Sequence, residues 1–137
     1  LALSPTRTYL PVLNEILKNH KESIHGIIHA TGGGHTKVLK YCDAPVHILK
    51  DNLFEVPPIF DIIQKSTDTS LAEMYKVFNM GTRLELYIDA EAAASIIEIS
   101  AIFNIRAQVI GRVEGSKDNS MSVTVITNTE TLVYQEK

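Results

Sequence analysis

Three consecutive glycines follow a short apolar segment early in this chain of 137 residues. The apolar segment, residues 24–28, is predicted to form a strand, and His29, Ala30 and Thr31 come between it and the glycines. Glycine adopts positive φ without steric cost and adds no bulk, so successive N–H groups of such a turn can point at one anion. The pattern therefore predicts either a purely structural tight turn or a turn whose Gly32, Gly33 and Gly34 bind a phosphate group.

Length and composition favour one globular unit. With 45% hydrophobic and 21% charged residues, the chain has the size and composition of an ordinary domain, and we predict a single domain over residues 1–137. The net charge of −3 gives no electrostatic reason to expect nucleic acid or an anionic membrane surface as a partner. The sequence contains no apolar run of about 18 residues, which argues against a membrane span. A single cysteine, Cys42, fits a reducing cytoplasm.

The hydrophobic periodicity predicts helices and strands in an irregular order. Ser70 and Glu73 have the spacing of a capping box, and Asp89 is predicted to cap a long helix. Strands are sometimes adjacent in the sequence, which favours an α+β fold over a regular parallel array. The expected helices are residues 11–20, a short one from Pro57 or Pro58, 70–78 and one after Asp89; the expected strands are 24–30, 45–49, 82–88, 107–113, 121–127 and 131–135.

Five short stretches occur in an order typical of one known family: residues 5–9, 29–34, 57–64, 73–81 and 109–113. With them the chain resembles the C-terminal half of aminoimidazole ribonucleotide synthetase, which is phosphoribosylformylglycinamidine cyclo-ligase of purine biosynthesis. The stretch 73–81, Glu-Met-Tyr-Lys-Val-Phe-Asn-Met-Gly, is the most specific of the five. The resemblance covers nearly all of the chain. It implies a layered α+β domain with a mixed, largely antiparallel sheet covered by helices.

The resemblance also implies an activity for the full-length protein. Members of this family close the imidazole ring of formylglycinamidine ribonucleotide at the expense of ATP, which gives aminoimidazole ribonucleotide, ADP and phosphate. ATP and magnesium are expected to be held mainly by an N-terminal half that precedes this domain in the family. The expected partners are the ribonucleotide substrate, ATP, the chain's own N-terminal domain and a second copy in a homodimer. Residues 1–137 alone are expected to be inactive, as an excised C-terminal half.

Candidate site residues come from the matching motifs. His29, at the end of a strand, is a catalytic candidate, or else a hydrogen-bonded histidine that fixes the loop. Asn79 and Gly81 either form a helix-ending turn or face the same cleft as the glycines. Thr6 and Arg7 either line a solvated helix entrance or reach a phosphate. The full set proposed to bind substrate or phosphate is Thr31, Gly32, Gly33, Gly34, Asn79, Gly81, Thr6 and Arg7.

The histidines do not predict a metal site. His25 and His29 share a strand face, but four residues at about 3.3 Å each place them roughly 13 Å apart. His29 and His35 can meet across the glycine turn, yet no carboxylate or cysteine is near in sequence to complete a set of ligands. We therefore predict no metal bound by this chain alone.

Two departures from the family pattern keep other functions open. The segment after Gly34 is shorter than usual, and Thr82 and Arg83 replace a small apolar residue and a glycine. Related ATP-using enzymes are therefore alternatives: formylglycinamidine synthetase, selenophosphate synthetase, thiamine-phosphate kinase or the hydrogenase maturation factor. A non-catalytic domain that binds a ligand or supports a dimer is the alternative from a different class.

Overall fold

A computed structural model describes residues 7–135, and these residues divide into two compact units. One unit takes the described residues up to Ile27 together with Leu86–Val109, and the other takes Ile28–Glu85 with the described residues from Ile110 onward. The predicted single domain over residues 1–137 stays a prediction.

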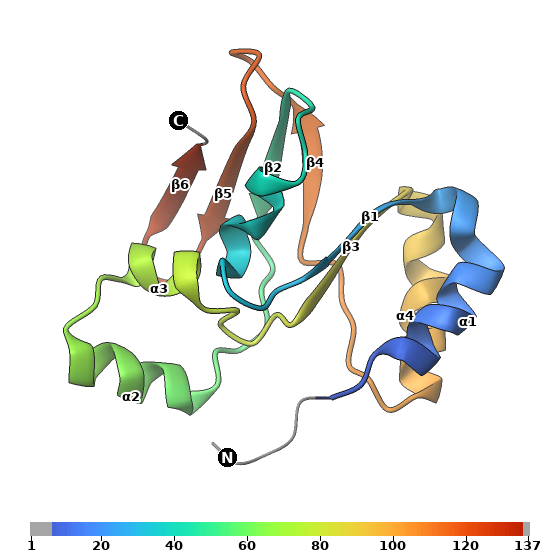
Figure 1. Ribbon diagram of the computed structural model, residues 1–137, viewed down its shortest axis with the longest axis horizontal. Helices are drawn as coiled ribbons and strands as arrows, with labels where there is room; N and C mark the ends of the chain where they lie inside the picture. The colour runs from blue at the N-terminus through green and yellow to red at the C-terminus, as the bar shows by residue number, and fades with distance from the viewer. Residues whose placement is uncertain (1–6, 136–137) are drawn as a thin grey trace. The chain divides into compact units, whose positions relative to one another are not determined.

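The first unit is built on two helices that lie side by side (Figure 1). The helix α1, Leu10–His20, has a proline in its first turn as predicted and is followed by a 3₁₀ turn, η1, Lys21–Ser23. A second 3₁₀ turn, η3, Ala90–Ala92, leads into α4, Ala93–Ile102. Their shared core consists of Val12, Ile16, Ala92 and Ile96.

The prediction that the Asp89 side chain caps the helical segment after it is wrong. Asp89 does precede η3, but its side chain makes no capping hydrogen bond. One carboxylate oxygen of Asp89 instead lies 2.7 Å from Nε2 of His25, and only the main-chain carbonyl of Asp89 accepts from the Ala92 amide. The imidazole competes with the helix amides for the carboxylate, and in this structure it is the imidazole that the carboxylate contacts.

A two-stranded sheet contains residues of both units. It pairs β1, Ile24–His29, with β3, Leu84–Ile88. Hydrogen bonds from Asp89 N to Ser23 O and from Ala30 N to Arg83 O lie just beyond its two ends, which is the arrangement of an antiparallel pair. The predicted strands at 24–30 and 82–88 are thus confirmed.

The second unit contains a four-stranded sheet in the order β4-β2-β5-β6 (Figure 1). Its strands are β2, Val46–Lys50; β4, Gly111–Gly115; β5, Ser122–Ile126; and β6, Thr131–Gln135. β2 pairs antiparallel with β4 and parallel with β5, and β5 and β6 form the predicted antiparallel hairpin. The expected α+β fold with a mixed, largely antiparallel sheet is confirmed.

The start of β4 was predicted too early. The strand was expected from residue 107, but the ladder between β2 and β4 begins where Lys50 pairs with Gly111. Residues before Gly111 continue past the end of β2 and lie outside the ladder. The Ile110 carbonyl accepts from the Asp51 and Asn52 amides at 3.1 Å each.

Helical segments complete this unit. The 3₁₀ helix η2, Gly34–Lys40, contacts β5, and α3, Leu71–Val77, packs against η2. α3 begins at the predicted capping residue, because the Ser70 hydroxyl accepts from the Glu73 amide at 3.2 Å. α2, Pro58–Thr67, starts at the predicted prolines and contacts α3. No helix among residues 7–135 is long and apolar enough to cross a membrane.

Candidate functional site

The glycine run forms a tight turn between β1 and η2. Gly33 has φ +98 and Gly34 has φ +47, so both occupy the region that favours glycine. The Gly34 amide donates to the Thr31 carbonyl across 3.4 Å, and the Thr36 amide donates to the Gly33 carbonyl at 3.1 Å. Among residues 7–135, the amides of Gly32 and Gly33 donate no hydrogen bond to the main chain. Gly32 is exposed, and nothing lies within 4 Å of a Cβ added there. Two amides of the turn are therefore left to meet a ligand.

The second predicted motif, around Asn79, is also a turn. The side-chain oxygen of Asn79 accepts from the Gly81 amide at 3.0 Å, and its main-chain carbonyl accepts from the Thr82 amide at 2.8 Å. Gly81 has φ +100, and an added Cβ there would lie 2.9 Å from Cδ of Pro57. Pro57 belongs to another of the matching stretches, so two of these stretches lie against each other at Gly81.

The glycine turn and the Asn79 turn are joined directly. Gly34 is buried against the carbonyl end of α3, where an added Cβ would overlap the Phe78 carbonyl oxygen and lie 2.5 Å from that of Tyr75. Nε2 of His35 lies 3.0 Å from the Asn79 carbonyl oxygen, which has no proton to give. His35 therefore carries a proton on Nε2 and donates it to Asn79. The structure thus brings together the two motifs that the sequence predicts to share a site.

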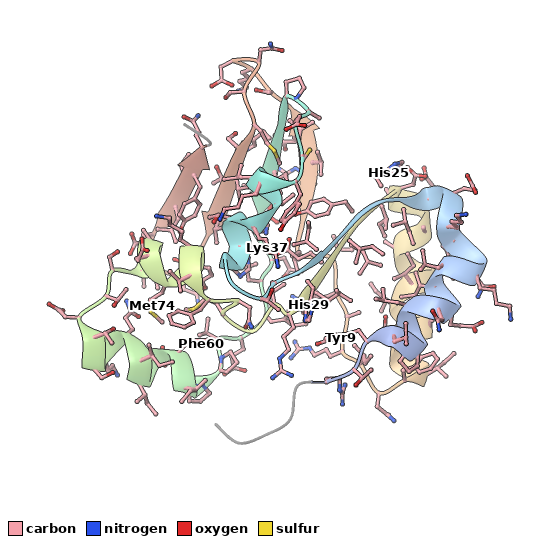
Figure 2. All side chains as sticks on the ribbon, viewed as in Figure 1. Tyr9, His25, His29, Lys37, Phe60 and Met74 are labelled. Atoms are coloured by element: carbon pink, nitrogen blue, oxygen red, sulfur yellow. The ribbon has the colours of Figure 1, made fainter. Side chains whose placement is uncertain are left out.

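Lys37 adds a positive charge to the glycine turn, and the sequence-based site did not include it. Its ammonium donates to the His29 carbonyl at 2.9 Å and to the Thr31 hydroxyl at 2.7 Å. Figure 2 shows Lys37 and His29 at the same turn. An ammonium has three N–H donors, so one donor is left for an anion. Its position in the sequence could have indicated this role, because Lys37 follows the glycines by one turn of a helix.

Other predicted site residues lie elsewhere or carry different contacts. His29 is exposed at the end of β1, and the exposed Thr31 receives the Lys37 ammonium. Arg7 belongs to the first unit, where its guanidinium donates to the Asn104 carbonyl at 2.6 Å. Thr6 lies outside the described residues. Roles for His29, Thr6 and Arg7 in catalysis or phosphate binding stay predictions.

Sequence reasoning missed a buried polar network below the two turns. Lys50 of β2 and Glu85 of β3 are 2% and 5% exposed, and their charged groups are 2.6 Å apart. The Lys50 ammonium also donates to the main-chain carbonyl of His35 at 3.0 Å. Strand alternation could have indicated that Lys50 is buried, because Lys50 shares a sheet face with the buried Ile48. The same alternation places Glu85 on the face of β3 opposite Leu84, Leu86 and Ile88, and it is Glu85 that is buried.

The His35 imidazole is held neutral by its surroundings. Burial, together with the charge of Lys50, lowers the pKa of His35 to about 3, against an opposing effect of the hydrogen bond to Asn79. Tyr75 packs on the ring with 5.2 Å between centroids. Because Nε2 carries the proton, Nδ1 has a free lone pair, and this atom makes no hydrogen bond within the described residues.

This lowered pKa predicts an acid-sensitive fold. Above the ordinary pKa of 6.5, His35 is neutral in both folded and unfolded chains. Below it, the unfolded chain takes up a proton that the folded chain excludes, so the free energy of unfolding falls by about 1.4 kcal/mol per pH unit from this residue. The fall continues toward pH 3. Urea denaturation of the wild type and of His35→Gln at pH 7, 6 and 5 checks it. Equal pH slopes for the two proteins would contradict the expectation.

Residues 7–135 contain no group of three or more histidine, cysteine, aspartate or glutamate side chains that could hold a metal ion. His35 points to Asn79 rather than across the turn to His29. The groups that the glycine turn offers to a ligand are amide N–H groups and the Lys37 ammonium.

Comparison with known proteins identifies the family. Residues 2–124 match the family described as AIR synthase related protein, C-terminal domain. The chain belongs to this family. The resemblance read from the five sequence stretches is thereby confirmed.

Three relatives of this AIR synthase related domain share one name. The chain is 42% identical over 112 residues to the phosphoribosylformylglycinamidine cyclo-ligase of Methanococcus vannielii, covering 82% of this chain and 31% of that protein. It is 38% identical over 114 residues to that of Methanocaldococcus jannaschii, covering 83% and 32%. The cyclo-ligase of Syntrophus aciditrophicus is 34% identical over 128 residues, with 89% and 35% covered. The chain thus spans about a third of the length of these relatives.

A solved structure has the same fold. The crystal structure of Escherichia coli HypE, a hydrogenase maturation protein, superimposes with a TM-score of 0.64 over 96% of this chain and 40% of that one. The sequences are 15% identical, so this likeness concerns the fold of the AIR synthase related domain alone.

Proposed function

We propose that this chain is the C-terminal domain of an ATP-dependent cyclo-ligase, which converts formylglycinamidine ribonucleotide to aminoimidazole ribonucleotide. In this domain, the glycine turn binds a phosphate group of the reactants. Family membership and the cyclo-ligase relatives support the reaction. One structural observation carries the site: two open amides, at Gly32 and Gly33, lie in the same turn as the Lys37 ammonium.

The chemistry of the reaction suits such a site. In the first step, the formyl oxygen of the substrate attacks the terminal phosphorus of ATP, and ADP leaves. In the second step, an internal nitrogen of the substrate attacks the formyl carbon, and phosphate leaves from that carbon while the nitrogen loses a proton. Both steps develop or move negative charge on phosphoryl oxygens, which fixed N–H donors and an ammonium stabilise. The described part of the chain contains no group of three or more histidine, cysteine, aspartate or glutamate side chains that could hold a metal ion. The share of the reaction that we assign to this chain is to bind and orient a phosphate.

Asn79 and Gly81 contribute by shaping the second turn. The Asn79 side-chain oxygen is engaged by the Gly81 amide, and the His35 ring holds the Asn79 carbonyl. Both residues therefore set the position of the turn relative to Gly34, which is buried against the end of α3. A rigid turn binds an anion better than a mobile one, because less ordering is needed on binding.

An NMR titration of the 137-residue chain with inorganic phosphate and with ATP tests the site. We expect saturable shifts of the Gly32 and Gly33 amides. Lys37→Met should weaken phosphate binding by about tenfold, the loss typical of a charge-assisted hydrogen bond. Lys40→Met is the matched control, because Lys40 is an exposed lysine of the same η2 helix.

Two results would count against the proposal. One is a set of shifts spread over the surface with no saturation at the turn. The other is equal weakening by Lys37→Met and Lys40→Met, which would mean that phosphate responds to overall charge. Absence of any response to phosphate or ATP would favour the non-catalytic alternative.

A further inference from the structure

The buried charges below the two turns have no role in the binding site described so far. Lys50, Glu85 and His35 are each at most 5% exposed, and they come from β2, β3 and η2. Burial of a charged pair is costly unless good geometry and further hydrogen bonds compensate, so it is weak support for stability alone. The contacts of this network lead instead toward the site.

The first link runs from Lys50 to the glycine turn. Its ammonium donates to the carbonyl of His35, the residue directly after Gly34, at 3.0 Å. The second link is the His35 ring, whose Nε2 donates to the Asn79 carbonyl at 3.0 Å. One residue of η2 thus connects β2 on one side with the Asn79 turn on the other.

Glu85 determines what the His35 ring does. Its Oε1 atom lies 2.6 Å from Lys50 Nζ and 3.6 Å from Nδ1 of His35. With Lys50 present, the buried charges of lysine and glutamate cancel, and His35 stays neutral with its proton on Nε2. Without Lys50, one negative charge would remain buried beside the Nδ1 lone pair. The simplest way to restore neutrality is uptake of one proton between Glu85 Oε1 and His35 Nδ1.

We propose that Lys50 is a positioning residue for the phosphate site: its ammonium, bound to Glu85 and to the His35 carbonyl, keeps the His35 ring as a fixed donor to Asn79 and so holds the two turns together. This proposal rests on the proposed function for its effect on binding. Its effect on the His35 ring is independent of any ligand. The groups that face the ring are Lys50 from β2, Glu85 from β3, Tyr75 from α3 and the Asn79 carbonyl.

Nitrogen-15 NMR of the His35 imidazole in the 137-residue chain is the direct test. In the wild type at pH 7 we expect a neutral ring with the proton on Nε2 and an unprotonated Nδ1. In Lys50→Met, a side chain of similar length without charge, Nδ1 should shift toward the protonated or hydrogen-bonded value, and the Asn79 and Gly33 signals should move. A wild-type ring with its proton on Nδ1, or with protons on both nitrogens, would overturn the proposal.

The double variant Lys50→Met with Glu85→Gln separates charge balance from simple loss of packing. It removes both charges, so the His35 ring should return to the wild-type protonation state and the Asn79 amide should return toward its wild-type position. If the single variant fails to fold, the wild-type spectrum and the double variant still decide the question. A double variant in which Nδ1 remains protonated would contradict the proposal.

Phosphate affinity gives the functional readout. Lys50→Met should weaken binding of inorganic phosphate by about tenfold, as loss of a supporting residue behind a ligand commonly does. The double variant should regain only part of the affinity, because it restores charge balance but not the hydrogen bond to the His35 carbonyl, and Lys40→Met should retain wild-type affinity. If the wild type binds no phosphate, the proposed function fails, while the NMR signals of His35 and Asn79 still test the role of Lys50. Wild-type affinity in a folded Lys50→Met protein, with an altered His35 ring, would show that the network does not position the site.

Discussion

Replacing Gly34 with alanine is expected to destabilise the second unit by about 3 kcal/mol and to abolish phosphate binding at the glycine turn. An added Cβ would overlap the Phe78 carbonyl oxygen and lie 2.5 Å from the Tyr75 carbonyl oxygen. Neither neighbour is the flexible end of a side chain, so the turn itself has to move. In addition, φ at this position is +47, where alanine is strained. Urea denaturation and the phosphate titration measure the two effects.

Gly32→Ala is the control within the same turn. Nothing lies within 4 Å of a Cβ at Gly32, and its φ is outside the positive range. The free energy of unfolding should therefore stay close to that of the wild type. If Gly34→Ala and Gly32→Ala have similar free energies of unfolding, the packing of the turn against α3 is not as described.

Gly111→Ala is expected to have an effect at least as large on stability, about 3–5 kcal/mol, through a different element. Gly111 starts β4 opposite Lys50 of β2. An added Cβ there would overlap the Leu49 carbonyl oxygen and lie 2.9 Å from Cα of Lys50. The two strands must separate at this point to admit a methyl group. Because Lys50 is at the same position, the hydrogen bonds from its ammonium to Glu85 and the His35 carbonyl should weaken as well.

Gly115→Ala is the matched control for this strand. Gly115 ends β4 opposite Val46, and nothing lies within 4 Å of a Cβ there. Thermal unfolding of both variants checks the contrast. A Gly111→Ala protein with the same midpoint as Gly115→Ala would mean that the close approach of β2 and β4 is absent in solution.

Much of the fold could be predicted because local signals agree with the tertiary structure. The Ser70 cap, the prolines at the starts of α1 and α2, and the polar turn between β5 and β6 each act over a few residues. The start of β4 could not be predicted in this way. It depends on where the partner strand β2 ends, which is a property of strands far apart in sequence.

The turns of the candidate site could be predicted from the sequence, but the buried charged residues beside them could not. The glycines and Asn79 predict turns, because these residue types favour turn conformations. Lys50 and Glu85 are residue types that are ordinarily exposed, and nothing in either strand indicates that they meet. Lys50 and Glu85 lie in different sheets, so the contact between ammonium and carboxylate is a tertiary contact that no strand pattern encodes. The contacts of His35 are also tertiary, since its ring and its carbonyl bind two different elements.

The parallel pairing of β2 with β5 has a consequence for how the chain acquires its binding site. Ile48 lies beside Val123, so the inner strand β2 obtains one of its two partner strands from a segment much later in the sequence. Contacts between such distant segments form slowly, because a long loop must close before they contribute. During synthesis, the glycine turn emerges from the ribosome long before the strand that supports η2. The capacity to bind phosphate should therefore arise only after β5 has emerged and paired with β2.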